Sequence, residues 1–135
     1  ELGHHVKKDI WKGILVQIVL IFLSLYGISI LLESFYESFG LSEVSDYAGI
    51  PLLILFTALV STVSMPVAMW FSRRSEKNAD IFALEITGMK DEFSSAMQKL
   101  ADQNLSRKNP NKLVKWIFYS HPPIEDRIEL AKKYF

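Results

Sequence analysis

The first four residues, Glu1-Leu2-Gly3-His4, have the types and spacing of the second part of a His-Glu-x-x-His zinc-binding helix. In that motif two histidines four positions apart share a helix face and bind zinc. The glutamate beside the first histidine takes a proton from the water that the metal activates. Glu1 and His4 match the glutamate and the second histidine. The same four residues also suit a solvated helix end, so their spacing leaves both interpretations open.

A second group of candidate residues lies between Ser72 and Asp80, where Glu76 and Asp80 stand four positions apart. Residues at this spacing share a helix face. A carboxylate from a second helix is the third protein ligand that a catalytic zinc with two histidines requires. Asp80, one turn further, could orient a ligating histidine through its second ring nitrogen. The segment is also typical of a solvated helix whose acidic residues pair with Arg and Lys.

His121 precedes a pair of prolines that restrict the backbone. A histidine held in such a turn can donate a hydrogen bond to an oxyanion beside a metal. A bond from His121 to a neighbouring carbonyl is the plainer alternative. Arg127 lies in the helix that follows, where it could anchor Glu76, Asp80 or a substrate carboxylate. An ordinary surface salt bridge is the alternative for Arg127.

Two apolar blocks must bring these residues together. Residues 13–32 and 50–71 contain no charged side chain, and each is about as long as the roughly 20 residues that cross a bilayer core. Two such helices could instead be buried in a soluble protein. However, a chain of 135 residues has few polar residues left to cover both. We therefore predict an all-α fold: a helical membrane protein with two transmembrane helices and a cytoplasmic helical segment.

The distribution of charge predicts how the two blocks are oriented. No Lys or Arg lies between Gly13 and Ser72, and the charged side chains of the connection 33–49 are all acidic. By the positive-inside rule, both termini then face the cytoplasm and the connection faces the opposite side. Residues near His4 and residues just after Phe71 should consequently meet at one membrane face.

Composition excludes several classes of function. The formal net charge is zero, which argues against a nucleic-acid partner. The chain has no cysteine, and therefore no disulfide framework, thiolate nucleophile or cysteine-based zinc site. A secretory signal is excluded because the block 13–32 is too long for a signal core and no cleavage site follows it.

Three motifs, in this order and spacing, resemble the integral-membrane CAAX prenyl protease family and its shorter relatives, the bacterial heat-shock membrane metalloproteases. They are ELGHH, SRRSEKNADIFALEITG after the two spans, and YSHPPIEDRIELA near the end. The resemblance covers nearly the whole chain and implies Zn²⁺ as the cofactor. It implies Glu1 as the catalytic glutamate, His4 and Glu76 as zinc ligands, Asp80 as their supporting aspartate, and His121 and Arg127 at the catalytic centre.

The resemblance divides the chain into five parts. They are the remnant of the zinc-binding helix (1–12), a transmembrane helix (13–32), an extracytoplasmic or lumenal connection (33–49), a second transmembrane helix (50–71) and a helical catalytic segment (72–135). Because no proline or glycine pair separates Val6 from Ile14, the first helix is expected to run on into the first span. Further helices are expected over 73–86, 91–103 and 113–119, and after Pro123.

The function that the resemblance implies is that of a membrane-embedded zinc metalloendopeptidase. It would act on prenylated CAAX-type or other membrane-associated peptides, in contact with membrane lipid. It would lie in a bacterial or archaeal inner membrane or in the endoplasmic reticulum. In the family the first zinc histidine stands directly before the position of Glu1, and more spans lie upstream. The chain is therefore expected to be a C-terminal portion that is inactive without the upstream segment of the same enzyme.

The alternative is a catalytically silent two-span membrane module that binds partners. Placing a histidine before Glu1 and measuring bound zinc would separate the two interpretations. Zinc bound at one equivalent, and lost when Glu76 is changed, would favour the enzyme.

Overall fold

The computed structural model describes residues 2–6, 8–103 and 111–134, and these residues are helical with no strand among them. The all-α prediction is confirmed. The α-helices are α1 (Leu2–Val6), α2 (Asp9–Phe35), α3 (Ile50–Thr87), α4 (Lys90–Gln103), α5 (Lys112–Phe118) and α6 (Ile124–Tyr134). Two short 3-10 turns, η1 (Glu37–Phe39) and η2 (Tyr47–Gly49), lie between α2 and α3.

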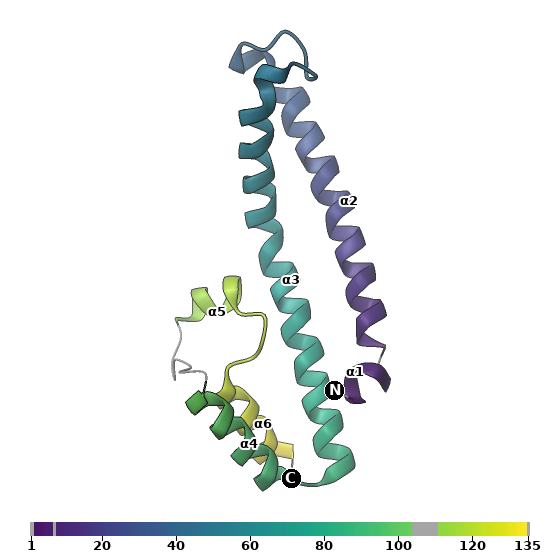
Figure 1. Cartoon of the computed structure of the whole chain (residues 1–135), viewed down its shortest axis with the longest axis vertical. Helices are drawn as coiled ribbons and strands as arrows, with labels where there is room; N and C mark the ends of the chain where they lie inside the picture. The colour runs from purple at the N-terminus through teal and green to yellow at the C-terminus, as the bar shows by residue number, and fades with distance from the viewer. Residues whose placement is uncertain (1, 7, 104–110, 135) are drawn as a thin grey trace.

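The helices α2 and α3 form a long hairpin (Figure 1). Their connection lies at one end of the hairpin, and the shorter helices lie toward the opposite end. We call the end with η1 and η2 the closed end and the end with α1, α4 and α6 the open end. A small core at the closed end consists of the buried side chains of Ile28, Leu52 and Phe56. The exposed ring of Phe35 lies beside this core, with its centroid 6.0 Å from that of Phe56. Packing of apolar side chains thus joins the two helices beside their connection.

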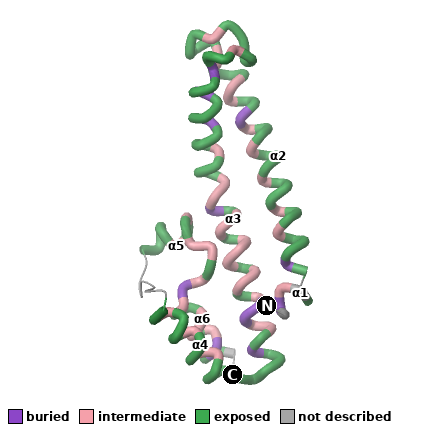
Figure 2. The backbone as a smooth tube through the Cα atoms, viewed as in Figure 1, coloured by how far each residue is buried: buried purple, intermediate pink, exposed green. Residues whose placement is uncertain are grey.

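Both hairpin helices are long and apolar enough to cross a membrane, as the sequence predicts. Of the residues in the most apolar stretch of each helix, only 6% in α2 and 17% in α3 are buried within the chain. Figure 2 shows exposed residues along most of α2. Burial of apolar surface is worth about 25 cal/mol per Å², so this exposure would be strongly unfavourable in water. The described part of the chain therefore leaves most of the apolar surface of the hairpin uncovered.

The prediction that the first helix continues into the first span is wrong. Helix α1 ends at Val6 and α2 begins at Asp9, while Lys8 between them has left-handed backbone with φ 53°. This conformation costs an ordinary residue about 1–2 kcal/mol. This cost is offset because the break lets α1 turn and pack on α3. The two helices approach so closely that a Cβ atom on Gly3 would lie 3.1 Å from Cα of Ala79. Close packing between helices therefore overrides the local preference for one continuous helix.

The second span and the helix expected after it form one element. Helix α3 extends over 38 residues, from Ile50 to Thr87, and passes through Pro66. It ends as predicted at Gly88, which has φ 65° and donates its N–H to the carbonyl of Leu84. A single helix therefore carries both the apolar part of α3 and the segment with Glu76.

The helices after α3 cover its end. Helices α4 and α6 pack against each other, α6 also packs on α3, and α5 lies beside α3 nearer its middle (Figure 1). Leu84 of α3 and Ala131 of α6 have no exposed surface. The bounds of α4, α5 and α6 agree with the predicted helices to within a few residues. This small helical layer holds the segment before α6 against α3.

Candidate active site

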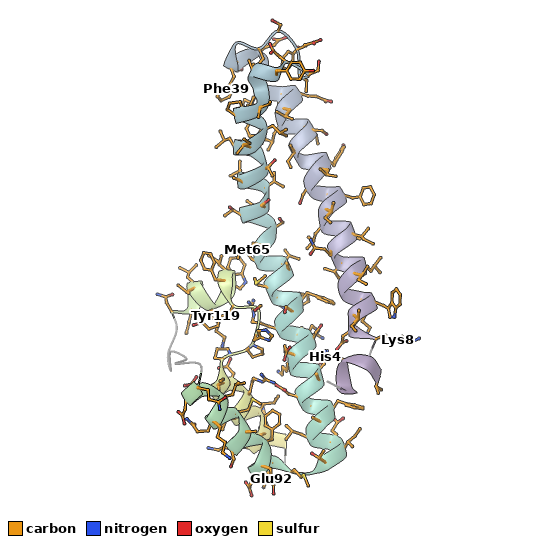
Figure 3. The ribbon with its side chains drawn as sticks, viewed as in Figure 1. His4, Lys8, Phe39, Met65, Glu92 and Tyr119 are labelled. Carbon is orange, nitrogen blue, oxygen red and sulfur yellow. The ribbon has the colours of Figure 1, made fainter. Side chains whose placement is uncertain are left out.

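Side chains from three separate parts of the chain meet at the open end. The Glu76 carboxylate oxygen Oε1 lies 3.7 Å from Nε2 of His4 and 3.2 Å from Nδ1 of His121. Figure 3 shows His4 on α1 beside α3. The structure therefore confirms that the region of His4 meets the helical segment that follows Phe71. It also brings His121 to the same carboxylate.

The second ring nitrogen of His4 is held by an acidic residue at the start of α2. Nδ1 of His4 lies 3.2 Å from Oδ2 of Asp9, whose side chain is buried. This arrangement leaves Nε2 of His4 directed toward Glu76. In metal-binding histidines, a carboxylate that accepts a hydrogen bond from the ring nitrogen not bound to the metal fixes the tautomer and the orientation of the ring. Asp9 therefore has the geometry of a residue that orients a metal-binding histidine.

Asp80 binds an arginine. Nε of Arg127 donates to Oδ2 of Asp80 at 2.7 Å, and Nη2 donates to Oδ1 at 2.6 Å. The side chains of Asp80 and Arg127 are 6% and 14% exposed, so the ion pair is largely shielded from water. The anchoring role expected of Arg127 is thus seen in the structure. The orienting of a ligating histidine, expected of Asp80, stays a prediction.

Arg127 also faces the carboxylate at the centre of the site. Its Nη2 lies 3.7 Å from Oε2 of Glu76. Burial alone would lower the pKa of Arg127, but the hydrogen bond and charge of Asp80, with the charge of Glu76, outweigh burial and raise the pKa above its ordinary value. Arg127 therefore stays charged at every accessible pH. One oxygen of Glu76 faces this fixed cation, and the other faces both histidines.

The residues that meet here have the donor chemistry of a zinc site. Imidazole nitrogen and carboxylate oxygen are usual zinc ligands, and two of them on a tetrahedral zinc lie about 3.3–3.6 Å apart. The 3.7 Å between Nε2 of His4 and Oε1 of Glu76 is close to that separation. Among the described residues no set of three His, Asp or Glu side chains has the arrangement of a complete metal site. Glu1, the expected base, lies outside the described residues. His4 and Glu76 therefore fit two positions of a zinc site.

A comparison of the sequence with protein families agrees with this chemistry. Residues 1–134 match the model of peptidase family M48. The chain belongs to peptidase family M48. The resemblance drawn from the three motifs is thereby confirmed, because relatives in this comparison include CAAX prenyl protease 1 homologs and HtpX proteases.

Relatives of this M48 chain come from bacteria and eukaryotes. The uncharacterized metalloprotease YhfN of Bacillus subtilis (strain 168) is 31% identical over 98% of the chain and 32% of its own length. The CAAX prenyl protease 1 homolog of Homo sapiens is 31% identical over 98% of the chain and 28% of its own length. The protease HtpX homolog of Desulfotalea psychrophila (strain LSv54 / DSM 12343) is 30% identical over 95% of the chain and 50% of its own length.

The chain spans half or less of the length of each of these relatives. No solved structure matches the chain.

The bond between His4 and Asp9 predicts that Asp9 strengthens metal binding. In the full-length protein, Asp9→Ala should weaken zinc binding about 10–100-fold, because the imidazole loses the partner that fixes its orientation. Competition with a chromophoric chelator measures this change. Asp91→Ala, which removes an acidic side chain from the first turn of α4, should leave the affinity unchanged. Equal zinc affinity in both variants would show that Asp9 has no such role.

The ion pair between Arg127 and Asp80 predicts a large loss of stability when one partner is removed. Arg127→Ala leaves the Asp80 carboxylate buried without its cation, which typically costs about 3–5 kcal/mol. Chemical denaturation in detergent micelles measures the free energy of unfolding. Adding Asp80→Asn should restore part of the loss, because the uncompensated charge is then gone. A double variant no more stable than Arg127→Ala alone would contradict this account.

Proposed function

We propose that this chain is the catalytic part of a membrane-embedded zinc metalloendopeptidase. The observation that carries the proposal is the approach of His4 Nε2 to Glu76 Oε1, at 3.7 Å, with the other nitrogen of His4 bound to Asp9. Membership of peptidase family M48 supports a protease. Zinc, when bound, would act as a Lewis acid that polarises the peptide carbonyl and lowers the pKa of water.

The side chains around this position would divide the work. His4 and Glu76 would hold the metal. Glu1 would act as general base and pass the proton to the leaving amine. His121, whose Nδ1 contacts Glu76, would donate a hydrogen bond to the oxyanion that develops on the substrate. Arg127, whose Nη2 faces Oε2 of Glu76, would hold that carboxylate in place.

The substrate class follows from the relatives and from the setting of the site. Several relatives are named CAAX prenyl protease 1 homologs. We propose that the substrates are prenylated CAAX-type C-termini or other membrane-associated peptides. The site stands just beyond the apolar part of α3, which could cross the bilayer, so a substrate anchored in lipid would approach it from the membrane. An upstream segment of the same enzyme would complete the site.

The position of the tryptophans supports a membrane boundary at the open end. The chain has three, all exposed: Trp11 on α2, Trp70 on α3 and Trp116 on α5. They belong to one level of the hairpin, because Gly13 packs beside Phe71 and the carbonyl of Trp116 bonds to Arg73. Tryptophan is enriched where a protein crosses the membrane interface. We propose that the interface lies at this level, in the inner membrane of a prokaryote or the endoplasmic reticulum, with both termini in the cytoplasm.

The proposed orientation predicts opposite labelling of two exposed positions. Because the chain contains no cysteine, Ser42→Cys and Ser95→Cys each introduce a single reactive thiol. In intact bacterial cells that express the protein in the inner membrane, a membrane-impermeant reagent should label Ser42→Cys and leave Ser95→Cys unlabelled until the cells are opened. Labelling of Ser95→Cys alone would reverse the orientation.

The division of roles predicts that two acidic substitutions differ in their effect on zinc. In the full-length protein, Glu1→Gln should lower peptidase turnover about 10²–10⁴-fold, the usual contribution of a general base, while one zinc stays bound. Glu76→Ala should remove zinc and activity together. Zinc is measured by elemental analysis. Glu85→Ala, at an exposed position of the same helix, is the matched control and should change neither quantity. Loss of zinc from folded Glu1→Gln, or retention of zinc by Glu76→Ala, would refute the assignment.

A further inference from the structure

Arg73 of α3 reaches the end of α5, more than 40 residues later in the chain. Its Nη1 donates to the carbonyl of Lys115 at 3.1 Å and to that of Tyr119 at 2.5 Å. Its Nη2 donates to the carbonyl of Trp116 at 3.2 Å. One guanidinium group therefore binds three carbonyls at the point where α5 ends.

The carbonyl of Trp116 lies in the last turn of α5, where a helix leaves such groups unpaired. The last carbonyls of an α-helix have no partner within the helix, and a cation at this end is favoured by the helix dipole. The rigid fork of a guanidinium can serve several carbonyls at once. Tyr119 follows α5 with extended backbone, and its N–H bonds to the carbonyl of Lys115. Arg73 thus fixes both the last turn of α5 and the direction in which the chain leaves it.

The chain leaves α5 toward the candidate active site. Tyr119 is two residues before His121, whose Nδ1 lies 3.2 Å from Oε1 of Glu76. Arg73 and Glu76 are three residues apart on α3 and therefore share one face of that helix. Two points of one rigid helix hold a short stretch of chain, one through the Tyr119 carbonyl and one through the His121 ring. On the other side of His121, Pro123 is buried.

We infer that Arg73 is a positioning residue for His121: it anchors the end of α5 so that the imidazole is held against Glu76. The His121 side chain is 64% exposed, so surrounding side chains do little to confine it. Its position must then come from the backbone on either side. The catalytic consequence of this inference rests on the proposed role of His121 in peptide hydrolysis, whereas the anchoring of the segment does not.

The neighbouring Arg74 offers a matched control. It carries the same charge, is exposed, and lies over the ring of Trp70 at 5.8 Å from the centroid. In the full-length protein, Arg73→Ala should speed hydrogen exchange of the backbone amides from Lys115 to His121 at least tenfold, while amides of α2 stay protected. Arg74→Ala should leave exchange in this segment unchanged. Equal exchange in the two variants would overturn the anchoring role.

A double-mutant cycle on peptidase activity tests the link to His121. Arg73→Ala should lower kcat about 10²-fold, the effect expected when a catalytic group is misplaced by about 1 Å, with KM and bound zinc unchanged. In a His121→Ala background, Arg73→Ala should cause little further loss, because the group it positions is already absent. Arg73→Lys should recover only part of kcat, since an ammonium lacks the fork. Losses that multiply in the double variant would show that Arg73 acts independently of His121 and would overturn the inference.

If the full-length protein cleaves no peptide at all, the proposed function fails. The exchange experiment still decides whether Arg73 anchors the segment.

Discussion

Two carboxylates one turn apart on α3, Glu76 and Asp80, organise the whole open end of the molecule. Asp80 is buried, and a buried charge is tolerated only with a partner; Arg127 supplies it through two short hydrogen bonds. This pairing fixes α6 against α3 and with it the turn that contains His121. Both His121 and His4 then lie close to the same oxygen of Glu76, Oε1. Charge neutralisation at one helix face thus gathers segments that are far apart in sequence.

The length and continuity of α3 give that face its place in the molecule. The helix begins in the apolar hairpin and ends beyond the site without interruption. Asp9 begins α2 and holds His4, so both hairpin helices contribute to the site at the same level. Apolar packing at the closed end is far from this chemistry (Figure 1). The hairpin therefore acts as a scaffold whose two helices carry the functional groups at one end.

Features that depend on local sequence were predictable. The apolar blocks predict long helices, Gly88 predicts the end of α3, and the spacing of Glu76 and Asp80 places them on one face. The charge distribution predicts that His4 meets the segment after Phe71, and the structure brings them together. The motifs also predict the protein family, and the match to peptidase family M48 confirms it.

Features that depend on long-range contacts were not predictable. The break at Lys8 has no local sequence signal, because it is stabilised by the packing of Gly3 on Ala79. Asp9 could have been noticed as an acidic residue just before an apolar block, five positions after His4. The contact between Asp9 and His4, however, depends on the break between α1 and α2. Arg73 is one of two adjacent arginines, and only the fold distinguishes the one that binds α5 from the one that faces Trp70.

The central claim is that His4 and Glu76 converge on one metal ion. Anomalous diffraction at the zinc absorption edge, from crystals of the full-length protein, tests this claim most directly. The account predicts a single strong peak within bonding distance of both Nε2 of His4 and Oε1 of Glu76. A zinc peak elsewhere in the molecule, or a zinc ion bound by His4 without Glu76, would contradict it.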